Sequence, residues 1–235
     1  MADPTGGALT GSLTEMANML IAAGGLGTAA MGVVDASKAF WGGPSNFGFR
    51  YVVNELDPFL AQLANNPTAF SKAQTVRTLK ANWLNGVPKA DQKAKAKSLI
   101  HLGLTRGNAQ GLANAAGVDA SGLQSLAEKT ASGAAVTQDE INVLGQFDAV
   151  LSAALDAAYE RGDQKYRNAA KLLAMVVATG MGGLGGWIAF SPNYTTTHIL
   201  LSLLIGVSAT PLAPVAKDLA STLQAAVTAV GAAKR

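Results

Sequence analysis

The segment from Leu172 to Ala216 contains no Asp, Glu, Lys or Arg, and it constrains the fold more than any other part of the sequence. It consists of two apolar runs separated by the short polar sequence SPNYTTT. An apolar α-helix needs about 20 residues to cross a hydrocarbon core about 30 Å thick. The sequence therefore predicts a transmembrane hairpin within residues 168–216. Pro211 and Pro214 should kink or end its second helix.

The composition of the whole chain agrees with a membrane location. Charged residues make up 14% of the chain and hydrophobic residues 49%, whereas a soluble domain usually contains about 25% charged residues. The absence of cysteine excludes disulfides and thiolate metal sites. A net charge of +3 does not by itself indicate a nucleic-acid partner. We expect the lipid bilayer as a partner, and no nucleic acid.

A third apolar run, from Met16 to Val34, also lacks charged residues. A signal peptide would carry a basic segment before such a run, but the residues before this one include two acids and neither Lys nor Arg. We therefore expect a retained transmembrane helix over residues 16–41, preceded by a short outside tail at 1–15. A buried amphipathic helix is the alternative.

The positions of the basic residues predict an orientation. Lys and Arg follow the first run, precede the hairpin and follow the hairpin, whereas the N-terminal tail and the hairpin loop contain none. Cytoplasmic segments next to membrane spans are enriched in these residues. Three spans with the N-terminus outside and the C-terminus in the cytoplasm satisfy every segment. Residues 42–167 then form a cytoplasmic domain, and residues 217–235 form an amphipathic tail.

The central region is predicted to be a helical bundle, because no alternating β pattern of useful length appears. Asp57-Pro58 and Asn66-Pro67 each place a capping residue before a proline at a first helical position. Shorter helices are expected between 107 and 133. The three predicted helices in the first part of the region are Pro58–Ala64, Thr68–Leu84 and Lys89–Leu104.

A long amphipathic helix is predicted after Thr137, which forms a capping box with Glu140. This helix is expected to run into the second span, with Gly162 as a weak point. The fold class is therefore all-α: an integral membrane protein with about three transmembrane helices and a cytoplasmic helical bundle. The apolar residues that recur at helical spacing are Ile141, Leu144, Phe147, Leu151, Leu155 and Tyr159.

Glycine spacing inside the apolar runs indicates close helix packing. Small residues four positions apart let two helix backbones approach within a membrane. Gly182 and Gly186 form a G-x-x-x-G pattern, and the first run offers Gly25, Gly27 and Gly32 in small-residue pairs. The spacing leaves open whether these contacts lie within one subunit or between subunits. A weakly hydrophobic first span favours a homo-oligomer or a subunit of a larger membrane complex.

Two groups of charged residues are candidates for function. Asp35 lies near the inner end of the first span with Lys38 three residues later, which indicates either a local ion pair or a group that lines a pore. Lys89, Lys93 and Lys97 repeat every four residues on one helical face. Such a face can contact anionic lipid headgroups, or it can simply be solvated.

The sequence contains no motif for catalysis or cofactor binding in the structural context that such a motif requires. Gly25 to Ala30 imitates the dinucleotide fingerprint G-x-G-x-x-A, but it lies within an apolar helix rather than between a strand and a helix. Only two histidines, His101 and His198, are present, and they cannot form an H-x-x-x-H metal pair. We expect no enzyme activity, no cofactor and no metal site.

The sequence FDAVLSAALDAAYERGDQKYRNAAKLLAMVVATG and the following hairpin, which ends LLSLLIGVSATPLAPVAKDLASTL, carry a family resemblance. They resemble uncharacterised bacterial inner-membrane proteins with an N-terminal span, a cytoplasmic helical region and a C-terminal hairpin. In those proteins a small residue and a proline precede an Asp-Leu pair, as Ala213-Pro214 and Asp218-Leu219 do here. The resemblance implies a bacterial inner membrane and no assigned reaction.

Two functions fit these features. The first is a non-enzymatic structural or scaffold subunit that self-associates through its Gly-rich spans and presents its cytoplasmic bundle to a partner. The second is an oligomeric channel in which copies of the first span surround a pore, with Asp35 near its inner mouth.

Overall fold

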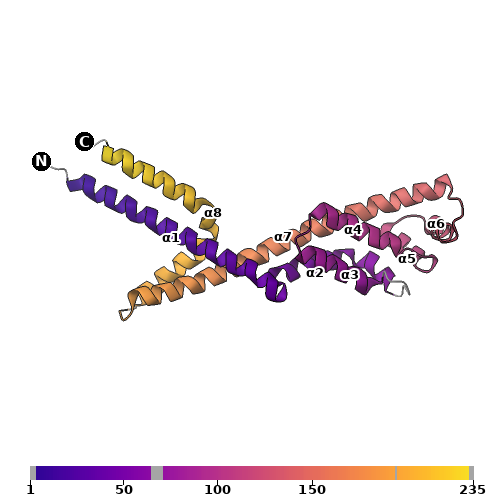
Figure 1. Cartoon of the computed structure of the whole chain (residues 1–235), viewed down its shortest axis with the longest axis horizontal. Helices are drawn as coiled ribbons and strands as arrows, with labels where there is room; N and C mark the ends of the chain where they lie inside the picture. The colour runs from indigo at the N-terminus through magenta and orange to yellow at the C-terminus, as the bar shows by residue number, and fades with distance from the viewer. Residues whose placement is uncertain (1–3, 65–70, 194, 233–235) are drawn as a thin grey trace. The chain divides into compact units, whose positions relative to one another are not determined.

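The computed structural model describes residues 4–64, 71–193 and 195–232, and all regular secondary structure in these ranges is helical (Figure 1). The all-α prediction is therefore confirmed, and three of the helices are long and apolar enough to cross a membrane. In chain order the elements are α1 (Pro4–Trp41), α2 (Gly43–Leu60), η1 (Ala61–Leu63), α3 (Lys72–Leu84), α4 (Lys89–Leu102), α5 (Arg106–Ala116), α6 (Ala120–Ser132), α7 (Gln138–Phe190) and α8 (Thr196–Ala232).

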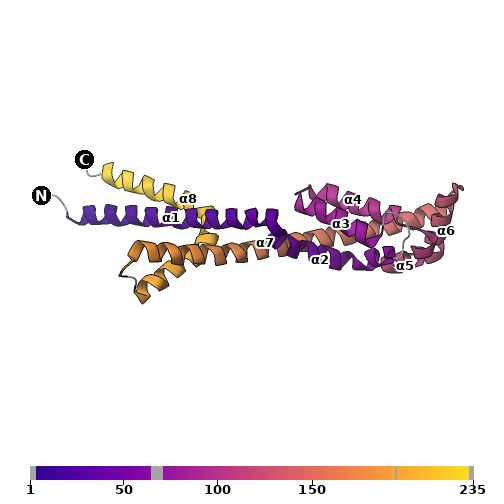
Figure 2. The same ribbon diagram turned by 60° about the horizontal axis from the view of Figure 1, so that its bottom comes forward.

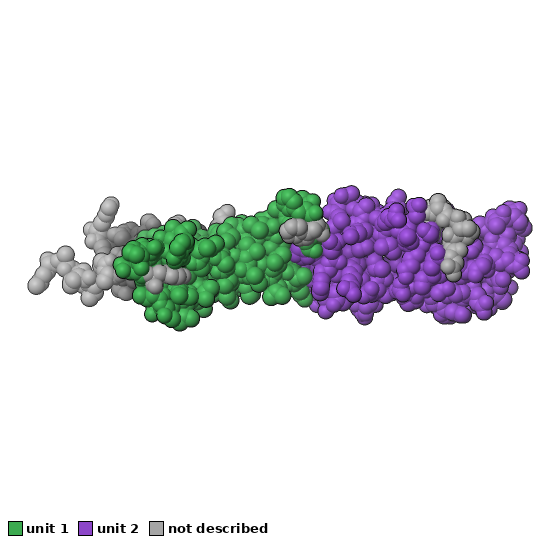
Figure 3. All heavy atoms as spheres, turned by 90° about the horizontal axis from the view of Figure 1, so that it is seen from below, with its two compact units in different colours: residues 1–43, 168–235 green, residues 44–167 purple. Residues whose placement is uncertain are grey.

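The chain divides into two compact units (Figure 3). Unit 1 contains residues 1–43 and 168–235, which include α1, the last part of α7 and α8. Unit 2 contains residues 44–167, which include α2 to α6 and the first part of α7. Helix α7 therefore contributes to both units as one continuous element of 53 residues.

Unit 2 has one apolar core to which each of its helices contributes. Phe59 of α2 and Phe147 of α7 meet edge to face, with 6.3 Å between ring centroids. Trp83, near the end of α3, packs against Phe49, and its indole N–H donates to the Ser45 carbonyl at 3.0 Å. These contacts fix α2, α3 and α7 side by side.

The end of α2 differs from the prediction. The sequence predicts a separate helix that begins at Pro58, and this is wrong: α2 continues through Pro58 to Leu60, and η1 follows directly. Leu56, Phe59 and Leu60 follow the helical repeat and are all buried in the core. Their packing outweighs the backbone hydrogen bond that Pro58 cannot donate.

The next two helices match their predictions at the described ends, except at the end of α4. Helix α3 begins at Lys72 and ends at the predicted residue, whereas the predicted start at Thr68 and the cap at Asn66-Pro67 lie outside the described residues. Helix α4 ends at Leu102 rather than at Leu104. The short helices expected between 107 and 133 are α5 and α6.

The predicted capping box at the start of α7 is confirmed. The Thr137 N–H donates to Glu140 Oε2 at 2.7 Å, and the Glu140 N–H donates to Thr137 Oγ1 at 3.4 Å. The Glu140 carboxylate also accepts hydrogen bonds from Lys129 and Ser125 of α6. These bonds, with that from Lys129 the strongest contribution, lower the pKa of Glu140 from 4.5 to about 2. The cap thus also joins α6 to α7.

Helix α7 passes through Gly162 without a break, as predicted. A Cβ at Gly162 would lie 2.5 Å from Val52 Cγ2, and a Cβ at Gly48 would lie 2.7 Å from the Gly162 carbonyl oxygen. Both distances are too short for a real side chain. The two glycines therefore permit close contact between α2 and α7, so Gly162 is a packing position.

Unit 1 is formed by three apolar helix segments, and most of its buried positions are occupied by small residues. Ala174, Ala178 and Ala209 are fully buried, with partly buried apolar neighbours around them. In contrast, more than three fifths of each of several bulky apolar side chains is exposed. These are Leu184, Ile188, Leu200 and Leu204. Small residues inside and large apolar residues outside are typical of helices packed within lipid.

Helix α8 changes direction part-way along its length in both views (Figures 1 and 2). It contains Pro211 and Pro214, and a proline inside a helix removes one backbone hydrogen bond and bends the axis. The prediction of a kink is confirmed, and the helix continues beyond it to Ala232. The bend lets different parts of α8 contact α7 and α1.

Candidate functional site

The hairpin of α7 and α8 is held by a glycine-to-glycine crossing. A Cβ at Gly182 would lie 2.7 Å from the Ser202 carbonyl oxygen and 3.2 Å from Gly206 Cα. A Cβ at Gly206 would lie 2.5 Å from Thr179 Cα. Because these neighbours are backbone atoms, a side chain at either glycine would force the two helices apart.

Helix α1 crosses α8 equally closely. A Cβ at Gly27 would lie 2.2 Å from the Ala209 carbonyl oxygen, and a Cβ at Gly24 would lie 2.5 Å from the Ala216 side chain. Further along α1, Val34 is also buried in unit 1. The hairpin and the first apolar run therefore form one packed unit within a single chain.

The five glycines predicted to pack helices fall into different environments. Gly27 and Gly182 lie at the crossings within the subunit, and Gly186 is half-buried further along α7. Gly25 and Gly32 lie on the exposed side of α1, where an added Cβ would meet no atom within 4 Å. The glycines of α1 thus divide between a face that packs within the subunit and a face that is open.

Gly206 is a packing residue outside the glycines predicted from the sequence. It is the only glycine of its apolar run, but Ser202, Gly206 and Thr210 are spaced by four residues and all three are buried. This small-residue repeat was the signal that could have identified the α8 side of the crossing.

Asp35 forms a local ion pair. Its Oδ1 lies 2.8 Å from Lys38 Nζ, one turn later on α1. The Asp35 side chain is 66% exposed and the Lys38 side chain 33%. This geometry is that of an i,i+3 ion pair on a helix surface, which is the first of the two alternatives that the sequence offered for these residues.

The three lysines that are candidates for contact with lipid headgroups each form an ion pair with an acid of α7. Lys89 Nζ lies 2.7 Å from Asp163 Oδ2, and Lys97 Nζ lies 2.9 Å from Asp148 Oδ2. Lys93 Nζ pairs with Asp156 between them. The acids recur at intervals of seven and eight residues along α7, so this row of ion pairs joins α4 to α7. Any contact with lipid would have to compete with it.

Asp163, at one end of this row, pairs with both Lys89 and Arg167. Burial acts to raise its pKa, but hydrogen bonds from Lys89 and from Arg167 outweigh burial and hold the pKa below its usual range. At the other end of the row, His101 Nε2 lies 2.6 Å from Asp148 Oδ1 without the alignment of a hydrogen bond. The His101 ring rests against Phe147 at 5.7 Å between centroids.

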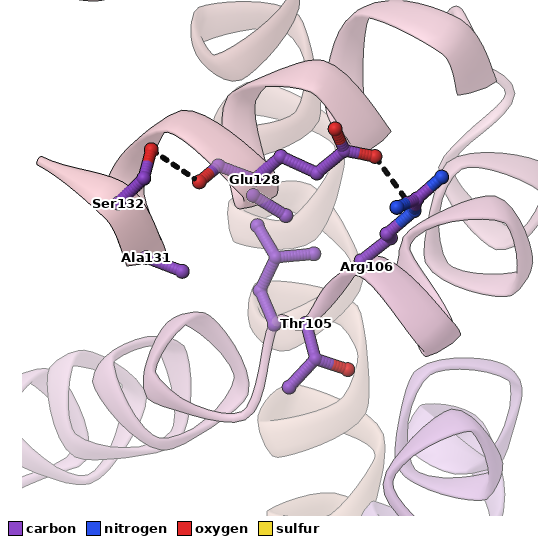
Figure 4. Close-up of a pocket in the computed structure, with 7 residues that line it drawn as sticks. Thr105, Arg106, Glu128, Ala131 and Ser132 are labelled. Carbon is purple, nitrogen blue, oxygen red and sulfur yellow. Dashed lines mark hydrogen bonds and ion pairs between the residues drawn. The ribbon is translucent and has the colours of Figure 1, made fainter. Parts of the chain in front are cut away.

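A cavity of about 420 Å³ opens beside α5 and α6 (Figure 4). Arg106 and Glu128 meet at its edge, with 2.7 Å between Nε and Oε1. The Ser132 hydroxyl donates to the Glu128 backbone carbonyl at 3.0 Å. The remaining lining residues are Leu104, Thr105, Ala127 and Ala131. The polar groups at this cavity are therefore engaged in local ion pairs and hydrogen bonds.

Within the described ranges, no three His, Cys, Asp or Glu side chains converge in a way that could hold a metal ion. Comparison with protein-family models, curated proteins and solved structures found no match to this chain. The resemblance to bacterial inner-membrane proteins thus stays a prediction from sequence. The features that bear on function are the open face of α1, the row of ion pairs between α4 and α7, and the exposed surface of unit 2.

Proposed function

We propose that the protein is a non-enzymatic membrane subunit that associates with further copies of itself through α1 and holds unit 2 as a scaffold beside the membrane. The orientation favoured by the basic residues places unit 2 on the cytoplasmic side of a bacterial inner membrane. The observation that carries the proposal is the division of α1 into two faces lined by small residues.

One face of α1 is occupied within the subunit, and the other is open. Gly24, Gly27 and Ala30 are buried in unit 1. On the exposed side, Gly25 and Gly32 leave room for the close approach of a second helix. Small residues on an exposed face of a membrane helix favour helix association, because they let the backbone of a second helix approach closely.

The hydroxyl group of Thr28, on the open face of α1, does not prevent a second helix from packing there. Thr28 is exposed, and its hydroxyl donates to the Gly24 carbonyl at 2.9 Å within α1 itself. Ala29, also exposed, adds a further small residue between Gly25 and Gly32. A second copy of α1 can therefore approach without burying an unsatisfied hydroxyl.

Unit 2 has the properties of a scaffold rather than of a flexible linker. Its core contains fully buried aromatic and aliphatic side chains, and ion pairs join helices that are distant in sequence. Burial raises the pKa of Tyr159 in this core to about 12. A rigid bundle of this kind can present one fixed surface from each copy.

The test is the oligomeric state of the full chain in lipid nanodiscs. We expect Gly25→Leu/Gly32→Leu to convert oligomers into monomers, because the bulky side chains fill the open face at positions where an added Cβ meets no atom of the subunit within 4 Å. Gly180→Leu/Gly185→Leu is the matched control, since an added Cβ at either of these exposed glycines of α7 also meets nothing within 4 Å.

The readout is the number of photobleaching steps per disc for chains labelled at one site. Unchanged oligomers in the α1 variant would refute the proposed interface. Monomers in the control alone would assign association to α7 instead. A wild-type chain that is monomeric at every protein-to-lipid ratio would refute self-association altogether.

A further inference from the structure

Helix α2 carries an exposed face that the core of unit 2 does not use. Phe47, Arg50, Tyr51 and Asn54 recur at helical spacing, and Arg50 and Asn54 are exposed. Phe47 is 54% exposed although it is a large apolar residue. The opposite face, which includes Phe49, is buried in the core. Helix α2 thus places an exposed aromatic ring next to a cation on a face that the core does not use.

Lys165 of α7 completes this surface. Its ammonium group lies 5.2 Å from the centroid of the Tyr51 ring, and the Tyr51 ring lies 5.9 Å from that of Phe47. The close contact of Gly48 with Gly162 and Tyr166 holds the start of α2 against this part of α7. We refer to Phe47, Arg50, Tyr51 and Lys165 as the aromatic–basic patch.

The cations of the patch are not neutralised by nearby acids. Neither Arg50 nor Lys165 forms an ion pair with any residue in the described ranges. Two acids close to the patch in the sequence are engaged elsewhere: Glu55 pairs with Arg161 at 2.7 Å, and Asp163 pairs with both Lys89 and Arg167. The patch therefore presents net positive charge together with aromatic surface.

The position of Lys165 along α7 identifies the kind of partner. Lys165 precedes Leu172, the first residue of the uncharged segment, by seven residues of continuous helix. At 1.5 Å per residue this is about 10 Å along the helix axis. The headgroup layer extends roughly 5–8 Å beyond each side of the hydrocarbon core. Lys165 is thus close in the chain to the uncharged segment, and long basic side chains near the end of a span extend toward the headgroup layer.

From this geometry we infer that the aromatic–basic patch binds the headgroups of anionic phospholipids in the membrane that the chain spans. Aromatic rings such as Phe47 and Tyr51 favour the interface between lipid and water. Arg50 and Lys165 supply the charge that selects anionic over zwitterionic headgroups. Lys89, Lys93 and Lys97, the other candidates for headgroup contact, are paired with acids of α7.

The experiment uses the full chain in a non-ionic detergent and a single cysteine at Asn54 that carries a polarity-sensitive fluorophore. The chain has no native cysteine, so the label is unique. The fluorescence change is titrated with short-chain phosphatidylglycerol and, separately, with short-chain phosphatidylcholine. We expect saturable binding of phosphatidylglycerol and at least tenfold weaker binding of phosphatidylcholine.

Arg50→Gln/Lys165→Gln should weaken phosphatidylglycerol binding about 30-fold, because each basic side chain near a headgroup contributes roughly a fivefold factor. The control is Arg77→Gln/Lys95→Gln, which removes the same two residue types from exposed positions on α3 and α4 that form no ion pair with any described residue. The control should bind normally. Arg50→Lys/Lys165→Arg, which keeps both charges, should retain binding within about threefold.

Three results would overturn the inference. The first is equal affinity for the two lipids. The second is an equal loss of binding in the Arg77/Lys95 control, which would show that only net charge matters. The third is the same saturable fluorescence change with inorganic phosphate alone. None of these outcomes bears on the oligomeric state, so the inference and the proposed function fail independently.

Discussion

A single methyl group should have opposite effects at two glycines of the same apolar region. At Gly206 an added Cβ would lie 2.5 Å from Thr179 Cα and 2.7 Å from the Ala178 carbonyl oxygen. Ordinary van der Waals contact begins at 3.4 Å. In Gly206→Ala, α7 and α8 must therefore separate by about 0.9 Å at their crossing, since neither neighbour is a side chain that can rotate away.

The magnitude follows from this separation. A gap of 0.5–1 Å removes a quarter to a half of the attraction between facing atoms, and overpacking of this kind costs about 1–3 kcal/mol. At Gly180 the added Cβ meets nothing within 4 Å, so Gly180→Ala has only the gain in helix propensity, about 0.5–1 kcal/mol. Because both variants have this gain, their free energies of unfolding should differ by about 1–3 kcal/mol.

The measurement is unfolding of the full chain in mixed micelles with a rising fraction of sodium dodecyl sulfate, followed by far-UV circular dichroism. Gly180→Ala should be as stable as the parent or more stable, and Gly206→Ala less stable. Gly182→Ala should resemble Gly206→Ala, because its Cβ would lie 2.7 Å from the Ser202 carbonyl oxygen. Equal stability of the Gly206 and Gly180 variants would refute the crossing.

Three further predictions concern unit 2. Glu140→Gln should lower stability at pH 7, and its deficit relative to the parent should shrink as the pH falls from 4.5 to about 2. A carboxyl with a lowered pKa stabilises the fold only while ionised; thermal unfolding at stepped pH measures this. Phe147→Ala should cost about 3–5 kcal/mol in chemical denaturation, since Phe147 is fully buried against Phe59. Lys93→Gln should cost at most about 1 kcal/mol in the same assay, with less effect in high salt, because Asp156 is 57% exposed.

Local patterns in the sequence were sufficient to predict most helices of unit 2. The capping box at Thr137 and the spacing of Phe147, Leu151 and Leu155 specify the start and the buried face of α7, and the structure shows both. Ile141 was assigned to the same face and is 49% exposed. The reason is that Glu140, rather than Ile141, turns toward α6, so a charged residue occupies the position where an apolar one was expected.

The contacts that individual residues make with other helices could not be predicted from local sequence patterns. On α1, four-residue spacing of small residues occurs on two faces, and only the position of α8 shows that Gly27 packs within the subunit while Gly25 does not. The ion pair of Lys89 with Asp163 likewise joins residues 74 positions apart. The spacing of residues along one helix indicates which side chains share a face, but it does not indicate which helix packs against that face.

The pairing of α1 with α8 has a consequence for biosynthesis. Gly27 meets Ala209, and about 180 residues separate them in the chain. At a translation rate of about 5–20 residues per second, the ribosome needs roughly 10–35 s to produce the later partner after the earlier one. For that interval both small-residue faces of α1 are uncovered. A nascent chain released before α8 is complete would therefore leave α1 without the neighbour that shields Gly27, and α7 without the helix that meets Gly182. Quality-control proteases of the membrane would meet small-residue faces that are covered in the finished protein.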